Sequence, residues 1–205
     1  MTAPLVPRPS PFQHFGEWFE AARMTDPQPE AAALATVGAD GQPSNRLVLV
    51  RQWDVRGFEV FTNLRSRKAQ EIGEQPRVAL TFHWKGAGPA RGGRQVRIEG
   101  VAEPVSAAES DAYWAARPRG SRISAIASDQ SEPIESREAL LAKRDALEQR
   151  HAEGEDVPRP AHWGGYRIVP LRVEFWQHED DRYHRRLLYI RSRAGAPWST
   201  AILQP

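Results

Sequence analysis

Short runs of β-branched and aromatic residues dominate the hydrophobic pattern of the chain from residue 31 onward. Five such runs, separated by turn signals such as GADG and DVRG, occur at residues 32–37, 45–53, 57–63, 77–84 and 94–105. Three more follow a polar, Pro-containing linker, at residues 166–170, 171–177 and 185–191. Short strands joined by hairpin-length turns predict an antiparallel sheet, and more than about five such strands usually curl into a barrel or sandwich.

A helical pattern occurs instead in four segments, at residues 10–24, 66–74, 106–116 and 132–153. The first has Ser10 as the expected N-cap, Pro11 at the first helical position and Gln13 completing a capping box. The third opens with a second capping box, from Ser106 to Glu109. The pattern as a whole predicts a mainly β fold with peripheral helices packed outside one barrel.

The composition is that of a soluble globular protein. Its 205 residues are 40% hydrophobic and 26% charged, which suits one core of ordinary size. No apolar run approaches the roughly 20 residues that cross a bilayer, and the start lacks the order of a secretion signal. We therefore expect a cytoplasmic protein without a membrane partner. Zero cysteines exclude disulfides and cysteine nucleophiles.

These features predict a single domain over residues 1–205, in which residues 1–10 are flexible. The glycine-rich stretch at residues 85–93 and the linker near Gly154 are expected to be mobile loops.

Nearly all of the positive charge comes from arginine. The formal net charge is +2, and of the 28 basic residues only Lys68, Lys85 and Lys143 are lysines. A net charge this small does not indicate a nucleic-acid partner, whereas the planar donor fork of arginine suits phosphate and carboxylate. A general compositional bias toward arginine explains many of these positions, so the placement of individual arginines has to carry the argument.

Several cations stand where an anion would be stabilised. Arg67 and Lys68 occupy the first turn of the helix predicted after Ser66, where free backbone amides and the helix dipole favour negative charge. Two cations there oppose the dipole unless an anion binds; the alternative is that both extend into water. Arg46 and Arg51 point to opposite faces of a regular strand, because the side-chain period is two. This arrangement suggests two anionic groups rather than one.

A third cationic unit lies in YWAARPRGS. Tyr113, Arg117 and Ser121 are four residues apart and would share one face of a continuous helix. Pro118 interrupts such a helix, because the residue before proline is pushed away from helical geometry. A phenol, a guanidinium and a hydroxyl at the end of a broken helix still suit a phosphate, and the alternative is an ordinary exposed helix end.

Other chemistries lack their motifs. His178 and His184 flank an acidic run, but their spacing matches no standard metal motif, so no metal is expected. No G-x-S-x-G, G-x-x-x-x-G-K-[ST] or G-x-G-x-x-G motif occurs. Nucleophilic hydrolysis and P-loop nucleotide binding therefore have no support.

Nine fragments form an ordered set along the chain: RLVLVR, FTNLRSRKA, RQVRIEG, YWAARPRGS, ASDQS, WGGYRIVP, VEFWQ, RYHRR and the C-terminal LQP. In order and spacing, from about Phe12 to Pro205, this set resembles the pyridoxamine/pyridoxine 5'-phosphate oxidase family. The resemblance implies an FMN-binding split β-barrel that forms a homodimer with FMN at the interface. It also implies oxidation of pyridoxamine or pyridoxine 5'-phosphate by dioxygen to pyridoxal 5'-phosphate and hydrogen peroxide.

The resemblance assigns residues to each ligand. For FMN they are Arg46, Leu47, Val48, Leu49, Arg51, Phe61, Thr62, Arg67, Lys68, Gln95, Gln130, Ser131, Trp176 and Arg186. For the substrate they are Arg51, Tyr113, Arg117, Ser121, Arg182 and His184. Arg182 and His184 alternate with Tyr183 along a segment expected to be extended, so they would face the same side. The resemblance places this catalytic pair against the substrate ring, where Arg182 would position the ring and His184 would assist orientation or proton movement.

The chain departs from the family pattern in four places. Arg51 stands where lysine is common, Phe61 where tyrosine is frequent and Arg185 where aspartate or asparagine is frequent, and the insertion at residues 85–93 is longer than usual. Three alternatives remain open. They are a related split-barrel flavin oxidase with another substrate, such as a phenazine-pathway oxidase, a non-catalytic FMN- or pyridoxal-phosphate-binding protein, and a nucleic-acid-binding barrel. The motifs RPRGS and WGGY beside RYH favour the vitamin B6 enzyme over the first.

Overall fold

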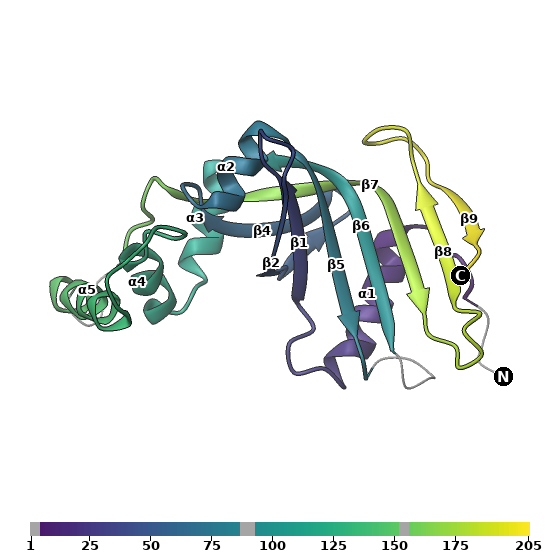
Figure 1. The fold of residues 1–205 in the computed structure, drawn as a ribbon, viewed down its shortest axis with the longest axis horizontal. Coiled ribbons are helices and arrows are strands. Elements are labelled where there is room, and N and C mark those ends of the chain that lie inside the picture. The colour runs from purple at the N-terminus through teal and green to yellow at the C-terminus, as the bar shows by residue number, and fades with distance from the viewer. Residues whose placement is uncertain (1–4, 87–92, 152–155) are drawn as a thin grey trace.

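The computed structural model describes residues 5–86, 93–151 and 156–205, which form one antiparallel sheet of nine strands with five helices (Figure 1). The strands are β1 (Ala31–Val37), β2 (Pro43–Leu49), β3 (Gln52–Asp54), β4 (Gly57–Asn63), β5 (Arg77–Trp84), β6 (Arg94–Pro104), β7 (Trp163–Gln177), β8 (Arg185–Ile190) and β9 (Ser199–Leu203). The helices are α1 (Pro11–Arg23), α2 (Arg67–Glu74), α3 (Ala107–Ala115), α4 (Arg119–Ala127) and α5 (Arg137–Arg150). The strand order is β2-β1-β5-β6-β7-β4-β3, with β8 paired to β7 and β9 to β8. The prediction of a mainly β fold is confirmed.

Strand β7 links the two ends of the molecule. Its first half pairs with β4 and its second half with β8, while its other edge follows β6. We expected two strands here, separated at Pro170. The structure has one, because the register shifts between Glu99 and Gly100 opposite this proline. Gly100 permits the close approach: a Cβ at this position would lie 2.3 Å from the Val169 carbonyl oxygen.

Helix α1 lies within the core rather than outside the sheet, contrary to the prediction that the helices pack outside the barrel. Phe15 is fully buried, and its ring centroid lies 4.9 Å from that of Phe58 and 5.0 Å from that of Phe82. The apolar face of α1 therefore fills the concave side of the sheet, because so curved a sheet leaves an interior that strand side chains alone do not occupy.

The N-terminal end of α1 is anchored to β8. The Tyr189 hydroxyl accepts from the Arg8 backbone N–H at 2.6 Å and lies 3.1 Å from Nδ1 of His14. The His14 ring is 2% exposed and stacks on Phe175 at 4.0 Å. Burial, followed by the positive charge of Arg8, lowers the pKa of His14 to about 4. Of the segment predicted to be flexible, residues 1–4 lie outside the described residues, as do residues 87–92 and 152–155 of the two predicted loops.

The helix starts follow the capping signals. Ser10 Oγ accepts from the Gln13 N–H at 3.2 Å, although the Gln13 side chain reaches Glu17 instead of closing the capping box. The Ser106–Glu109 box is complete. None of the described helices has the length and apolar character that crossing a membrane requires.

One predicted strand is interrupted. Residues 45–53 read as a single run, but β2 ends at Leu49 and β3 starts at Gln52. Between them Val50 is fully buried and donates its N–H to the Glu30 carbonyl oxygen at 2.9 Å, one position past the Ala31–Leu49 pair, so the pairing with β1 ends here and β3 pairs with β4 instead. Arg51 therefore stands at a bend, so the strand-parity argument for Arg46 and Arg51 does not apply.

Candidate functional site

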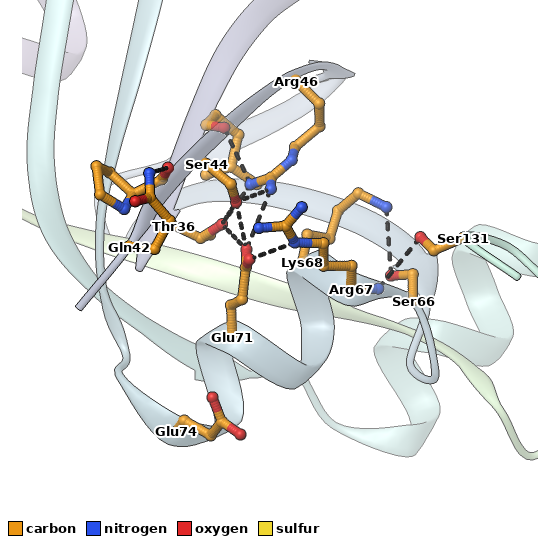
Figure 2. A network of polar contacts seen from close by, with 12 residues as sticks. Thr36, Gln42, Ser44, Arg46, Ser66, Arg67, Lys68, Glu71, Glu74 and Ser131 are labelled. Atoms are coloured by element: carbon orange, nitrogen blue, oxygen red, sulfur yellow. Dashed lines mark hydrogen bonds and ion pairs between the residues drawn. The ribbon is translucent and has the colours of Figure 1, made fainter. Parts of the chain in front are cut away.

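Arg46, Arg67 and Lys68 come together where β2 faces the first turn of α2, and we call these three residues the cationic cluster (Figure 2). Glu71, one turn further along α2, lies between the two arginines. Its Oε1 accepts from Arg67 Nε at 2.8 Å, and its Oε2 lies 3.1 Å from Arg46 Nη2. The sequence therefore located a real cluster of cations, and the structure adds a carboxylate at its centre.

Lys68 makes its contacts on the side of the cluster away from Glu71. Its Nζ donates to Gln130 Oε1 at 2.6 Å and to the hydroxyls of Thr62 and Ser66 at 3.2 Å each. The Ser66 hydroxyl thus accepts from a side chain and does not cap a backbone N–H of α2. Burial, together with the positive charge of Arg46, lowers the pKa of Lys68 to about 8. An anion placed here would hold this lysine in its charged form.

The loop after α4 closes the cluster. Thr62 Oγ1 donates to Gln130 Oε1 at 2.9 Å, and the Arg67 backbone N–H donates to Ser131 Oγ at 3.2 Å. Ser131 has φ = 80°, a left-handed conformation that is uncommon outside glycine. Four residues assigned by resemblance from distant parts of the chain, Thr62, Arg67, Gln130 and Ser131, are therefore brought together.

A second cluster of predicted residues surrounds the break between α3 and α4, and we call Arg51, Tyr113, Arg117 and Ser121 the arginine–tyrosine pocket. The chain breaks at Pro118, as predicted, and Arg117 Nη2 donates to the Ser121 carbonyl oxygen at 3.0 Å. Burial lowers the pKa of Arg117; of the two nearby groups, Tyr113 raises it and Arg51 lowers it. Arg51 itself forms an ion pair with Glu30, whose Oε1 lies 3.7 Å from Arg51 Nε.

The four residues line two different cavities, and an aromatic stack joins a residue of one to a residue of the other. One, of about 540 Å³, is lined by Arg51 and Tyr113, and the other, of about 500 Å³, is lined by Arg117 and Ser121. Phe61, from the wall of the second, stacks on Tyr113 with centroids 3.8 Å apart and ring planes 8° apart. Both volumes lie in the range of small-molecule sites.

Three further predicted residues lie on strands β6, β7 and β8. Gln95 pairs with Trp176, and Trp176 pairs with Arg186, so the three occupy adjacent register positions. Arg186 is held by Glu174, with Nε at 2.7 Å from Oε1. The exposed Leu47 and half-buried Val48 and Leu49 lie on β2, at the opposite edge of the strand order.

Arg182 and His184 follow β7 in a turn, so the predicted extended segment is wrong here. Arg182 has φ = 67°, which is incompatible with the strand alternation that we expected to place both side chains on one side. His184 Nδ1 accepts from the Glu179 backbone N–H at 3.1 Å, and its ring lies 4.7 Å from that of Trp176. The turn thus joins His184 to the Gln95–Trp176–Arg186 row.

The two groups of predicted residues lie at opposite ends of β7. Arg117 lies 5.0 Å over the ring of Trp163, the first residue of β7, whereas Trp176 and the turn bearing His184 are at its far end. At about 3.3 Å per residue the two tryptophans are up to roughly 40 Å apart along the strand. Figure 1 shows the same separation between α3 and α4 on one side and β8 on the other. A single chain therefore does not bring all of these residues to one ligand.

Sequence reasoning missed Glu71, Thr36 and Ser44, whose side chains hold Arg46 in place. The spacing of Glu71 from Arg67, four residues along a helix, was a usable signal for an ion pair. Thr36 had no signal, since its proximity depends on the β1–β2 register, in which it pairs with Ser44. Trp163, the first residue of the WGGY motif, lies under Arg117, and the sequence analysis gave it no role.

Comparison with known proteins matches both parts of the chain to one family. Residues 20–151 match the family model described as pyridoxamine 5'-phosphate oxidase. Residues 163–205 match the model described as the pyridoxine 5'-phosphate oxidase C-terminal dimerisation region.

Curated relatives are similar over nearly the full length. A Burkholderia orbicola protein named pyridoxine/pyridoxamine 5'-phosphate oxidase is 50% identical, covering 96% of this chain and 90% of the relative. A Rubrobacter xylanophilus protein of the same name is 52% identical, covering 96% and 88%.

Solved structures confirm the split β-barrel fold. PhzG from Burkholderia lata, in complex with tetrahydrophenazine-1-carboxylic acid, has a TM-score of 0.88 and 34% identity, covering 97% of this chain and 94% of that one. A pyridoxamine 5'-phosphate oxidase-related, FMN-binding protein from Nostoc punctiforme has a TM-score of 0.76 at 18% identity, covering 97% and 100%, and supports the fold alone. The chain therefore belongs to the pyridoxamine 5'-phosphate oxidase family.

Proposed function

We propose that this protein is an FMN-dependent oxidase that converts pyridoxamine 5'-phosphate, pyridoxine 5'-phosphate or both to pyridoxal 5'-phosphate, with dioxygen reduced to hydrogen peroxide. The main support for this proposal is a pair of cationic sites, the cationic cluster and the arginine–tyrosine pocket. Adjacent residues connect them, because Thr62 accepts from Lys68 in the first and Phe61 stacks on Tyr113 in the second. One site suits the phosphate of the flavin and the other the phosphate of the substrate. The names of the curated relatives support the same activity.

The cationic cluster has the donor set that a flavin phosphate needs. Within the described residues, Arg67 has no partner for its two terminal nitrogens, and Lys68 lies next to the hydroxyl and amide groups of Thr62 and Gln130. Arginine forks and buried ammonium groups bind phosphate oxygens strongly. Held by these residues, FMN would supply a hydride acceptor that dioxygen can reoxidise. This chain's residues supply binding, orientation and charge.

The arginine–tyrosine pocket is proposed to bind the substrate phosphate. Arg117 is fixed over Trp163 and to the Ser121 carbonyl oxygen, and within the described residues its Nη1 has no hydrogen-bond partner. Arg51 keeps the positive charge of the lysine common in the family but presents a fork instead of a point charge. Tyr113, which stacks on Phe61, is proposed to contact the same ligand.

His184 is proposed to act as a hydrogen-bond donor. Because its Nδ1 accepts from the Glu179 N–H, the neutral ring carries its proton on Nε2. A ring in this tautomer donates to a substrate oxygen through Nε2 and has no free lone pair with which to accept a proton. This favours orientation over proton removal, while Arg182 is proposed to position the substrate ring.

The separation along β7 supports a homodimer in which each site uses both chains. The arginine–tyrosine pocket of one protomer would meet Arg182 and His184 of its partner, which lie within the family's dimerisation region at residues 163–205. A cytoplasmic location stays a prediction.

The decisive experiment is anaerobic addition of pyridoxamine 5'-phosphate to the flavin-loaded protein. We expect the visible flavin band to bleach and to return with stoichiometric peroxide when oxygen is admitted. A flavin-loaded protein that does not bleach with either B6 phosphate would refute the proposed substrate.

Shared sites are tested by subunit complementation. Arg117→Met and Arg182→Ala chains, each inactive alone, would form mixed dimers with one intact site. Random assembly would restore about a quarter of wild-type activity. If both arginines serve the same chain's site, mixing restores nothing.

A second candidate is a flavin oxidase with a phenazine-like substrate, favoured by the likeness to PhzG. Such a tricyclic acid lacks a phosphate, so it would leave Arg51, Arg117 and Ser121 without their proposed role. Bleaching by a reduced phenazine carboxylic acid, with no response to the B6 phosphates, would select this candidate.

A further inference from the structure

Glu71 is the most heavily hydrogen-bonded carboxylate near the proposed flavin phosphate site. Its side chain is 7% exposed, and its Oε2 accepts from Thr36 Oγ1 at 2.5 Å and from Ser44 Oγ at 2.6 Å, in addition to Arg46. Its Oε1 takes the Arg67 bond. Figure 2 shows these bonds converging on one carboxylate from β1, β2 and α2.

These bonds leave the two arginines with different sets of available hydrogen-bond donors. Both terminal nitrogens of Arg46 donate hydrogen bonds, which fixes its guanidinium; the acceptors are Leu34, Thr36, Ser44 and Glu71. Within the described part of the chain, only its Nε has no partner. Arg67 gives Glu71 only its Nε, so among the residues that the structure describes its Nη1 and Nη2 have no partner. A guanidinium held in this way loses little rotational freedom when it binds a phosphate.

The charge balance is consistent with a ligand. Three cations and one carboxylate leave the cluster with a net charge of +2, which matches a phosphate monoester near pH 7. Burial raises the pKa of Glu71, but hydrogen bonds from Ser44, Thr36, Arg67 and Arg46 outweigh it and bring the pKa to about 2. Glu71 is therefore charged at any working pH.

We propose that Glu71 is a positioning residue for the flavin phosphate, which holds Arg46 and Arg67 so that the Arg67 fork and Lys68 face the same anion. This inference rests on the proposed function. The direction of the change in FMN affinity distinguishes positioning from simple electrostatics. By Coulomb repulsion alone, a negative charge near a phosphate weakens binding, so removing it would strengthen binding. If positioning dominates, removing that charge weakens binding instead.

The test compares FMN with riboflavin, the same ring system without the phosphate. In Glu71→Gln we expect FMN affinity to fall on the order of tenfold or more, while riboflavin affinity stays within twofold of wild type. Glu74→Gln is the matched control. It removes the same charge from the same helix, but Glu74 accepts from the Ala39 backbone N–H at 3.0 Å and makes no ion pair with the cluster. We expect its FMN affinity to be unchanged within about twofold.

Quenching of flavin fluorescence gives the dissociation constants. Equal or tighter FMN binding by Glu71→Gln overturns the inference and leaves the proposed function standing. An equal loss of FMN and riboflavin affinity also overturns it, because it indicates general disruption of the site. A wild-type protein with no preference for FMN over riboflavin removes the proposed phosphate site, and with it the proposed function.

Discussion

Replacing Gly165 with alanine tests whether the stack of Phe61 on Tyr113 positions the side chains proposed to bind the substrate. Gly165 pairs with Phe61 across β4 and β7, and a Cβ at this position would lie 2.7 Å from Phe61 Cδ1 and 2.8 Å from Cε1. Carbon atoms in contact need about 3.5–4.0 Å, so the ring must move by about 1 Å. It has little room, because Tyr113 covers its other face at 3.8 Å.

Two effects follow from this displacement. Overpacking of a rigid ring costs about 1–3 kcal/mol, and in a domain of this size each kcal/mol lowers the Tm by about 2–4 °C. Because Phe61 carries Tyr113 with it, a shift of about 1 Å in the substrate site is expected to lower kcat/KM for pyridoxamine 5'-phosphate by up to about 100-fold. Calorimetry measures the first effect, and peroxide release at saturating FMN measures the second.

The neighbouring glycine supplies the control. In Gly164→Ala the new Cβ would lie 3.2 Å from Cδ1 of Leu64, the end of a flexible side chain. We expect this variant to keep near-normal kcat/KM. Adding Phe61→Leu to Gly165→Ala should restore part of the lost stability, because the smaller side chain relieves the contact. A Gly165→Ala protein with wild-type Tm and kcat/KM would show that Phe61 adjusts freely and that the stack positions nothing.

Arg182→Ala should lower turnover by about 100-fold or more while flavin stays bound; turnover near wild type removes Arg182 from the mechanism. Because the pKa of Lys68 is lowered to about 8, FMN affinity measured by titration calorimetry should fall above pH 8. The stability of the flavin-free protein relative to Lys68→Met, measured by urea unfolding, should rise from pH 8 to 10.5, because the unfolded chain binds the extra proton there. The same pH dependence in wild type and Lys68→Met would contradict this. The pKa of His14 is about 4 in the folded protein and 6.5 in the unfolded chain. The free energy of unfolding should therefore fall by on the order of 3 kcal/mol as the pH falls from 6.5 to 4, and this loss should be absent from His14→Phe. Equal shifts of the urea midpoint in both proteins would refute it.

Features that depend on local sequence were predictable. The complete Ser106–Glu109 capping box and the break at Pro118 needed only residues within one turn of each other. Most strands were found because alternation and turn residues act over a few positions. The run at residues 45–53 was predicted as one strand because the interruption comes from a change of partner strand, from β1 to β4, which local sequence does not show.

The candidate site divides in the same way. Arg67 and Lys68 were predictable because a helix start concentrates amide donors. The left-handed backbone of Arg182 was not, since a sequence without glycine at that position gives no signal for it. Glu71 was overlooked because its partners Thr36 and Ser44 come from a hairpin whose register the sequence does not specify.

The length of β7 connects the fold to the proposed chemistry. A strand that runs from Trp163 to Gln177 places the arginine–tyrosine pocket at one end and the turn bearing Arg182 and His184 at the other. Two groups fixed to opposite ends of a rigid strand cannot approach each other through local motion, because bending β7 would break its ladders with β6 on one edge and β4 and β8 on the other. If both groups contact one small substrate, a second copy of the chain must supply one of them, so dimerisation would be a condition for activity and not only for stability.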